Sequence, residues 1–183
     1  MADEQATHTR RPGAFTARGN ELTALGDELR PGAQAPDALL AGKGFVPSPL
    51  RISDYRGRVL ILSCVPSLDT PTCDRETRHW EEERRALGGD IEMLTVSTDL
   101  VFAQARWCGA ADVTHTTASA YMNPQFGIDY GLLMEENHLL GRAVFVIDRE
   151  GRIRHAEYVR ELTTEPDYGA ALAAAREAAA GQR

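Results

Sequence analysis

The clearest pattern in the chain is the nearly unbroken apolar run from Val59 to Val65, which lies between Gly57 and Pro66. An apolar run of this length between turn residues is typical of a strand that is covered on both faces. The segment from Ile91 to Ser97 has a similar pattern and follows after a stretch long enough for one helix. We therefore expect two core strands with a helix between them.

The segment between these strands carries the signals of a capped helix. Thr70 can cap its start, Pro71 suits the first helical position, and the glycine pair at 88 and 89 can end it. Thr98 and Asp99 can cap a second, short helix after the second strand. A strand, a helix and a strand in this order form a βαβ unit, whose strands run parallel with a right-handed crossover.

Two hairpins are expected outside this unit. A weak hairpin signal covers residues 15–29, and a strong one covers residues 142–159, with a turn at 148–151 between β-branched segments. The sequence from Thr164 to Asp167 resembles a capping box that opens an alanine-rich C-terminal helix. Residues 39–49 are expected to be a loop with at most a short strand, and residues 125–140 a linker with weak helical character. This order predicts an α/β fold with a mixed sheet, helices on both faces and an N-terminal β-hairpin.

Length and composition favour a single globular domain. The chain has 183 residues, of which 43% are hydrophobic and 26% charged. The polar residues 1–14 are interpreted as a disordered leader, and residues 15–183 as one domain. The net charge of −7, without a block of basic residues, argues against a nucleic-acid partner. No segment resembles a membrane span or a signal peptide.

The three cysteines are an odd number, which does not suit a framework of structural disulfides. A reducing, cytoplasmic location is therefore expected. Cys73 would occupy the third position of the helix that starts after Thr70. Free amide groups and the helix dipole at that position favour a thiolate, so Cys73 is a candidate nucleophile. The alternative from the residue type alone is a cysteine that only fills a small apolar site.

The residues before Cys73 decide between these interpretations. The spacing Pro66-x-x-x-Thr70-x-x-Cys73, after a strand and at the start of a helix, resembles the peroxidatic motif of the peroxiredoxins. The longer sequence from Pro66 to Cys73 resembles that of the thiol peroxidase subfamily, the atypical two-cysteine peroxiredoxins. Residues 96–109, 141–148 and 163–168 contain further matching sequences. The resemblance implies a thioredoxin-like fold.

It also implies roles for individual residues. Cys73 would attack a peroxide and become a sulfenic acid, Thr70 would hold the peroxide by its hydroxyl, and Pro66 would shield the sulfur from solvent. Arg142 would favour the thiolate and stabilise negative charge on the peroxide oxygens. Cys108, 35 residues after Cys73, would be the resolving cysteine and would form an intrachain disulfide with it.

The resemblance further implies a thioredoxin-like dithiol as reductant, a small hydroperoxide as substrate and a homodimer as assembly. No cofactor is implied, and the cysteine and histidine spacings do not suggest a metal site. Cys64, inside the apolar run, is expected to be buried and idle. Two alternatives stay open from the sequence. One is a one-cysteine peroxidase that uses an external resolving thiol, and the other is a peroxide-responsive redox sensor.

Overall fold

A computed structural model describes residues 8–181 of the chain. Its strands are β1 (Arg10–Ala17), β2 (Asn20–Leu25), β3 (Leu39–Ala41), β4 (Pro49–Arg51), β5 (Val59–Cys64), β6 (Ile91–Ser97), β7 (Thr116–Ser119), β8 (Leu133–Met134), β9 (Ala143–Ile147) and β10 (Ile153–Tyr158). Its helices are the 3-10 turn η1 (Ile52–Tyr55) and the α-helices α1 (Pro71–Ala86), α2 (Val101–Ala111), α3 (Pro124–Asp129) and α4 (Tyr168–Ala180).

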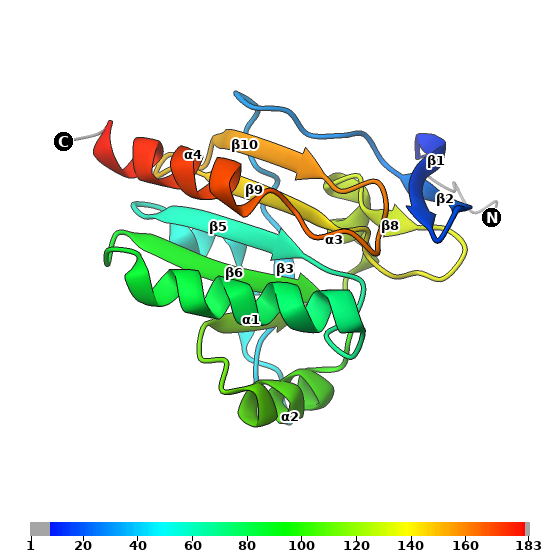
Figure 1. Cartoon of the computed structure of the whole chain (residues 1–183), viewed down its shortest axis with the longest axis horizontal. Coiled ribbons are helices and arrows are strands. Elements are labelled where there is room, and N and C mark those ends of the chain that lie inside the picture. The colour runs from blue at the N-terminus through cyan, green and yellow to red at the C-terminus, as the bar shows by residue number, and fades with distance from the viewer. Residues whose placement is uncertain (1–7, 182–183) are drawn as a thin grey trace, which may run out of the picture.

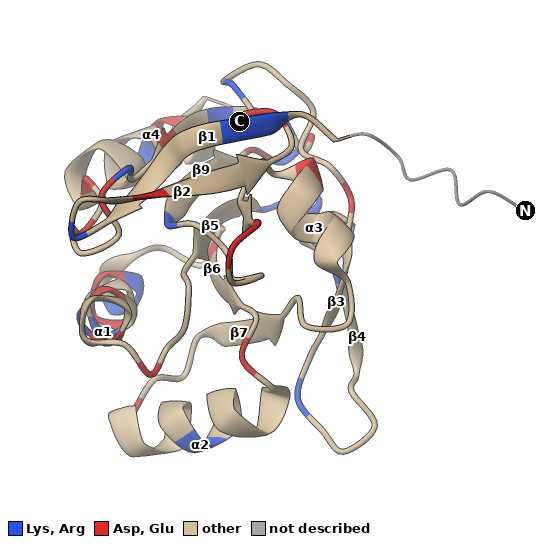
Figure 2. Ribbon diagram, turned by 90° about the vertical axis from the view of Figure 1, so that its right-hand side faces the viewer, with Lys and Arg blue, Asp and Glu red and all other residues tan. Residues whose placement is uncertain are grey.

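The core is a seven-stranded mixed sheet in the order β10-β9-β5-β6-β7-β3-β4. Strands β5, β6 and β7 run parallel, whereas β9 pairs antiparallel with β5. Helices α1 and α4 lie on one face of this sheet (Figure 1), and α3 lies on the other (Figure 2). The predicted α/β fold with helices on both faces of a mixed sheet is therefore confirmed.

Strand β5 is buried throughout because both of its faces are covered. Val59 and Ile61 point to the face where Trp80 of α1 and helix α4 pack. Leu60 and Leu62 point to the opposite face, where the core includes residues of α3. The side chains of a strand alternate between its two faces, so an apolar residue at every position is what a two-sided core requires.

The N-terminal hairpin is confirmed, but it begins earlier than expected. Strand β1 starts at Arg10, so residues 10–14 belong to a strand and not to a leader. Arg10 and Arg11 pair with Leu25 and Ala24 of β2. Their side chains form ion pairs with Glu135 and Glu28, respectively. These partners are distant in the sequence, so the polar N-terminal segment gave no local strand signal. The predicted leader at positions 1–7 lies outside the described residues.

Two predicted helix caps are wrong. Asp99 does not cap α2, which has Leu100 at the N-cap and no side-chain cap bond. Thr164 does not cap α4. That helix begins three residues later, where the Asp167 side chain accepts a hydrogen bond from the amide of Ala170 at 2.9 Å. In both places several short polar residues could cap equally well from the sequence, and tertiary contacts select among them.

The loosely defined segments contain more structure than expected. The predicted loop at 39–49 holds the short strand β3 and leads into the edge strand β4. The predicted linker at 125–140 holds α3 in part and β8. Within residues 8–181, no helix is long and apolar enough to cross a membrane.

The register of the sheet positions the chemistry. Cys64, the last residue of β5, pairs with Ala143 at the start of β9 and with Val96 near the end of β6. The antiparallel pairing therefore brings Arg142, which precedes β9, to the carboxyl end of β5. Helix α1 begins beyond the same end, after a loop of six residues at 65–70. Two segments about seventy positions apart in sequence thus meet at one edge of the sheet.

A buried carboxylate joins α1 to the segment before β7. Glu81 is only 3% exposed and accepts hydrogen bonds from the amide and Nδ1 of His115, both at 2.9 Å. It also accepts from the hydroxyl of Thr114 at 2.8 Å and from Arg84 at 2.7 Å. These contacts hold the pKa of Glu81 well below its usual value, although burial opposes the shift.

Glu81→Gln should lower the free energy of unfolding by about 2 kcal/mol, because charge-assisted hydrogen bonds of this kind contribute about 1.5–3 kcal/mol and an amide cannot accept all of them. Guanidinium denaturation at pH 7 measures the change. Glu82→Gln, on the exposed neighbouring position, is the matched control and should stay within about 0.5 kcal/mol of the wild type. Equal effects of the two substitutions would contradict the prediction.

His115 should make the fold sensitive to acid. Burial lowers its pKa below the ordinary value of 6.5, and Glu81 only partly opposes this shift. As the pH falls below about 6.5, the unfolded chain takes up a proton at this position more readily than the folded chain, so the free energy of unfolding decreases. Denaturation at pH 7 and pH 5.5 should show a smaller decrease in His115→Gln than in the wild type, and equal decreases would contradict this role.

Candidate active site

Cys73 is the third residue of α1 and is fully buried. The helix starts as the sequence predicts, with Thr70 at the N-cap in an extended conformation and Pro71 at the first position. Thr70 does not cap through its side chain, however, because its hydroxyl donates to the carbonyl of Ser67 at 2.9 Å. The sulfur therefore lies at a helix N-terminus without a side-chain cap, where backbone amides favour an anion.

Asp99 holds the loop between β5 and α1 in place, a role that the sequence analysis missed. Asp99, after β6, accepts from the hydroxyl of Ser67 at 2.7 Å and from the amide of Leu68 at 2.8 Å. The hydroxyl of Ser97 donates to the same carboxylate at 2.7 Å. Asp99 therefore fixes the segment that leads from Pro66 to Thr70.

Arg142 is 1% exposed, and its guanidinium connects three parts of the chain. Its Nη2 donates to the sulfur of Cys73 at 3.3 Å and to the carbonyl of Leu162 at 2.8 Å. Its Nη1 forms an ion pair with Glu76. Its Nε has no hydrogen-bond partner among the described residues. Burial alone would lower the pKa of Arg142, but the negative charges of Glu76 and Cys73 outweigh it and raise the pKa.

Glu76 is the second site residue that the sequence analysis missed. It lies one helical turn after Cys73, is fully buried, and accepts from Ser63 at 2.7 Å and from the indole of Trp80 at 3.3 Å. Burial raises its pKa above the ordinary value, while Arg142 and Ser63 oppose the shift. The spacing of Cys73, Glu76 and Trp80 places all three on one face of the helix, which was the available signal.

An open pocket of about 490 Å³ leads to this group. Its wall contains three residues that the sequence singled out, Pro66, Thr70 and Arg142. The other residues along it are Arg18, Pro71, Thr72, Arg75, Leu162 and Thr163. Cys73 itself is behind this wall, in contact with Arg142. Of the predicted residues, Pro66, Thr70 and Arg142 therefore line one pocket, and Cys73 contacts Arg142 from the protein interior.

Cys108 lies on α2 and is 4% exposed. It belongs to the same small apolar cluster as Cys73, together with Val65, Leu68, Trp107 and Val113. Its sulfur is 3.6 Å from the hydroxyl of Thr117. All three cysteines of the chain are free in this structure.

Polar contacts fasten the two cysteine-bearing helices to each other. The indole of Trp107, next to Cys108, donates to Asp74, next to Cys73, at 3.1 Å. Arg78 lies over the Trp107 ring at 5.5 Å from its centroid and donates to the carbonyl of Ala111 at 3.1 Å. The structure therefore holds both cysteines in intact helices.

Cys64 is the last residue of the inner strand β5 and is fully buried, as predicted. Burial raises the pKa of its thiol well above the ordinary value, which makes it a poor nucleophile at neutral pH. Among residues 8–181, no group of three or more histidine, cysteine and acidic side chains is arranged to hold a metal ion.

Comparisons with known proteins agree with this geometry. The family model described as Redoxin matches residues 30–172. A thiol peroxidase of Halalkalibacterium halodurans is 43% identical over 90% of this chain and 98% of its own length. One of Bacillus subtilis is 41% identical over 88% of this chain and 96% of its own length. A peroxiredoxin-like protein from Aquifex aeolicus, of known crystal structure, superposes with a TM-score of 0.83 at 31% identity and covers 94% of this chain and 99% of its own.

The contact between Arg142 and Cys73 predicts a measurable effect on the thiol. In a background with Cys64→Ser and Cys108→Ser, the double variant Arg142→Gln/Glu76→Gln removes the donor without leaving a buried carboxylate unpaired. Alkylation of Cys73 by iodoacetamide at pH 7 should then be about tenfold slower, because a hydrogen bond to a charged group is worth about 1.5–3 kcal/mol.

Intact-mass spectrometry over time measures the alkylation rate. Arg154→Gln, which removes an exposed guanidinium outside the pocket, is the control and should leave the rate unchanged. An unchanged rate in the double variant would show that Arg142 does not stabilise the thiolate.

Proposed function

Because this chain belongs to the redoxin family and is a thiol peroxidase of the peroxiredoxin type, we propose that it reduces hydrogen peroxide and organic hydroperoxides by means of Cys73. The observation that carries the proposal is the hydrogen bond from Arg142 to the Cys73 sulfur at the helix N-terminus, behind an open pocket. A guanidinium donor and a helix N-terminus at the sulfur are the surroundings in which nucleophilic cysteines are found.

In the first step the Cys73 thiolate attacks the terminal oxygen of the hydroperoxide. A sulfur–oxygen bond forms, the oxygen–oxygen bond breaks, and the product alkoxide or hydroxide takes up a proton to leave as an alcohol or as water. Cys73 is oxidised to a sulfenic acid, and the peroxide is reduced by two electrons.

Arg142 and Thr70 would form hydrogen bonds with the oxygens of the bound hydroperoxide. The Nε of Arg142 has no hydrogen-bond partner among residues 8–181, and it would stabilise the charge that develops as the oxygen–oxygen bond breaks. Thr70 lines the pocket, and its hydroxyl would accept a hydrogen bond from the bound hydroperoxide, because its own proton is used on Ser67. Pro66 contributes an apolar wall that limits the access of water to the sulfur.

In the second step the thiol of Cys108 attacks the sulfenic acid. A disulfide forms between Cys73 and Cys108, and water leaves with the sulfenic oxygen. The common apolar cluster that contains both residues supports this pairing. Because both cysteines are buried in helices, at least one of the helices must partly unwind to let the sulfurs meet.

The cycle closes by thiol–disulfide exchange with a thioredoxin-like dithiol, which becomes oxidised while Cys73 and Cys108 return to thiols. We include this reductant and a homodimeric assembly in the proposal on the basis of the family membership.

Peroxide consumption in the presence of thioredoxin, its reductase and NADPH tests the scheme. Cys73→Ser should reduce the rate to the uncatalysed background, because the nucleophile is lost. Cys108→Ser should remove sustained turnover but still consume about one equivalent of peroxide per Cys73. Cys64→Ser is the control and should keep the wild-type rate.

The same variants separate the alternatives. Sustained turnover in Cys108→Ser would indicate a one-cysteine peroxidase with an external resolving thiol. Stoichiometric oxidation of the wild type without turnover would indicate a redox sensor. Activity that survives in Cys73→Ser would overturn the proposed function.

A further inference from the structure

The pocket is much larger than hydrogen peroxide requires. Its volume of about 490 Å³ lies in the range of sites that bind organic molecules, about 300–1,000 Å³, whereas a water molecule occupies about 30 Å³. Pro66, Pro71 and Leu162 give it apolar surface. Arg18, from the tip of the β1–β2 hairpin, contributes to its rim. The following inference concerns this residue and rests on the proposed function.

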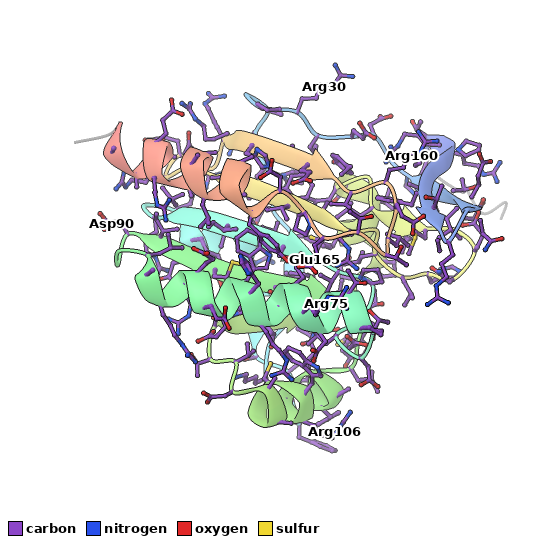
Figure 3. The ribbon with its side chains drawn as sticks, viewed as in Figure 1. Arg30, Arg75, Asp90, Arg106, Arg160 and Glu165 are labelled. Carbon is purple, nitrogen blue, oxygen red and sulfur yellow. The ribbon has the colours of Figure 1, made fainter. Side chains whose placement is uncertain are left out.

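Arg18 differs from the other two arginines of this pocket in its contacts. Arg142 is paired with Glu76, and Arg75 with Glu165 at 3.0 Å, where the start of α1 approaches the segment before α4 (Figure 3). Among the described residues, no hydrogen-bond acceptor or carboxylate contacts the guanidinium of Arg18. Its positive charge is therefore available to a ligand.

The backbone that carries Arg18 is fixed with respect to the reacting groups. The amide of Thr16 donates to the carbonyl of Arg160 at 2.7 Å, and the amide of Leu162 donates to the carbonyl of Thr16 at 2.8 Å. The carbonyl of Leu162 in turn accepts from Arg142. The hairpin tip and the guanidinium beside Cys73 are thus attached to the same short segment of chain.

The carboxylate of Glu161 is also at this tip, but it does not neutralise the guanidinium. It accepts from the hydroxyls of Thr16 at 2.8 Å and Thr163 at 2.7 Å, and from the backbone amide of Arg18 at 3.2 Å. These neutral donors lower its pKa to about 2, so the carboxylate stays ionised and occupied. Glu161 therefore orients the turn and leaves the arginine side chain free.

The conformation of Arg18 is unfavourable for an arginine. Its φ of 49° lies in the left-handed region, as does that of Gly19 at 84°. A two-residue hairpin turn with positive φ at both positions favours asparagine, aspartate or glycine at the first of them. A strained residue whose side chain makes no structural contact points to a function of that side chain.

We propose that Arg18 is a specificity-determining residue that binds an anionic group, in particular a carboxylate, on an organic hydroperoxide. The apolar part of such a substrate would lie along Pro66, Pro71 and Leu162, and its hydroperoxide group would reach Arg142 and Cys73. A fatty-acid hydroperoxide carries these three parts, a carboxylate, a hydrocarbon chain and a hydroperoxide, and therefore serves as the probe of Arg18.

The test compares kcat/KM for a fatty-acid hydroperoxide as the free acid and as its methyl ester, in the same non-ionic detergent, with hydrogen peroxide as a third substrate. Arg18→Asn removes the charge and suits the left-handed backbone, so the hairpin is retained. It should lower kcat/KM for the free acid about fivefold, the upper range for an exposed ion pair, and leave the ester and hydrogen peroxide unchanged. Arg18→Lys should restore most of the loss, and 0.5 M salt should reduce the difference.

Arg30→Asn, an exposed arginine outside the pocket (Figure 3), is the control and should leave all three rates unchanged. An unchanged rate for the free acid in Arg18→Asn, or an equal loss for all three substrates, would overturn the role of Arg18 and leave the proposed peroxidase function intact. A wild type that consumes none of the three peroxides would overturn the proposed function, and this inference with it.

Discussion

The buried guanidinium of Arg142 is the group on which the arrangement of the site depends. A charge removed from water must be paired and hydrogen-bonded, because leaving one partner of a buried ion pair alone costs about 3–5 kcal/mol. Here the partners come from helix α1, through Cys73 and Glu76, and from the segment before α4, through the carbonyl of Leu162. The start of α1, the start of β9 and residues 160–163 therefore hold each other in place.

The pairing of Arg142 with both Glu76 and Cys73 also suits the proposed reaction, in which Cys73 loses its charge. In the proposed first step, in which a Cys73 thiolate becomes a neutral sulfenic acid, Arg142 still has Glu76 as its counter-ion. The site then never contains a buried cation without a partner, and the helix start does not have to rearrange for electrostatic reasons alone. Ser63 and Trp80 keep the second carboxylate oxygen occupied, so Glu76 remains in place throughout.

The sequence predicted those parts of the fold whose signals are local. The apolar run of β5, the turn residues around α1 and the β9–β10 hairpin each identify an element without reference to distant contacts. The roles of Glu76, Glu81 and Asp99 could not be predicted in this way. Acidic residues in or near a helix usually face solvent, and the partners that bury these three lie up to 66 residues away. The early start of β1 was missed for the same reason.

The same contacts indicate which cysteine moves when the proposed disulfide forms. Cys73 is fixed by the ion pair at the start of α1, so its displacement would disturb the buried charges. Cys108 lies in the last turn of α2, a helix of 11 residues that has no side-chain cap at its start. Helices of this length are marginal on their own.

The last turn of α2 is held by fewer buried contacts than the start of α1. It ends at Asp112, whose φ of 54° lies in the left-handed region that aspartate adopts more readily than most residues. The carbonyl of Cys108 accepts from the amides of Asp112 and Val113, so opening this turn breaks only two backbone hydrogen bonds. The side-chain restraints that must open are the bond from Trp107 to Asp74 and the bond from Arg78 to the carbonyl of Ala111, and both are less buried than the ion pair of Arg142. We therefore expect the end of α2 to unwind and carry Cys108 to a stationary Cys73.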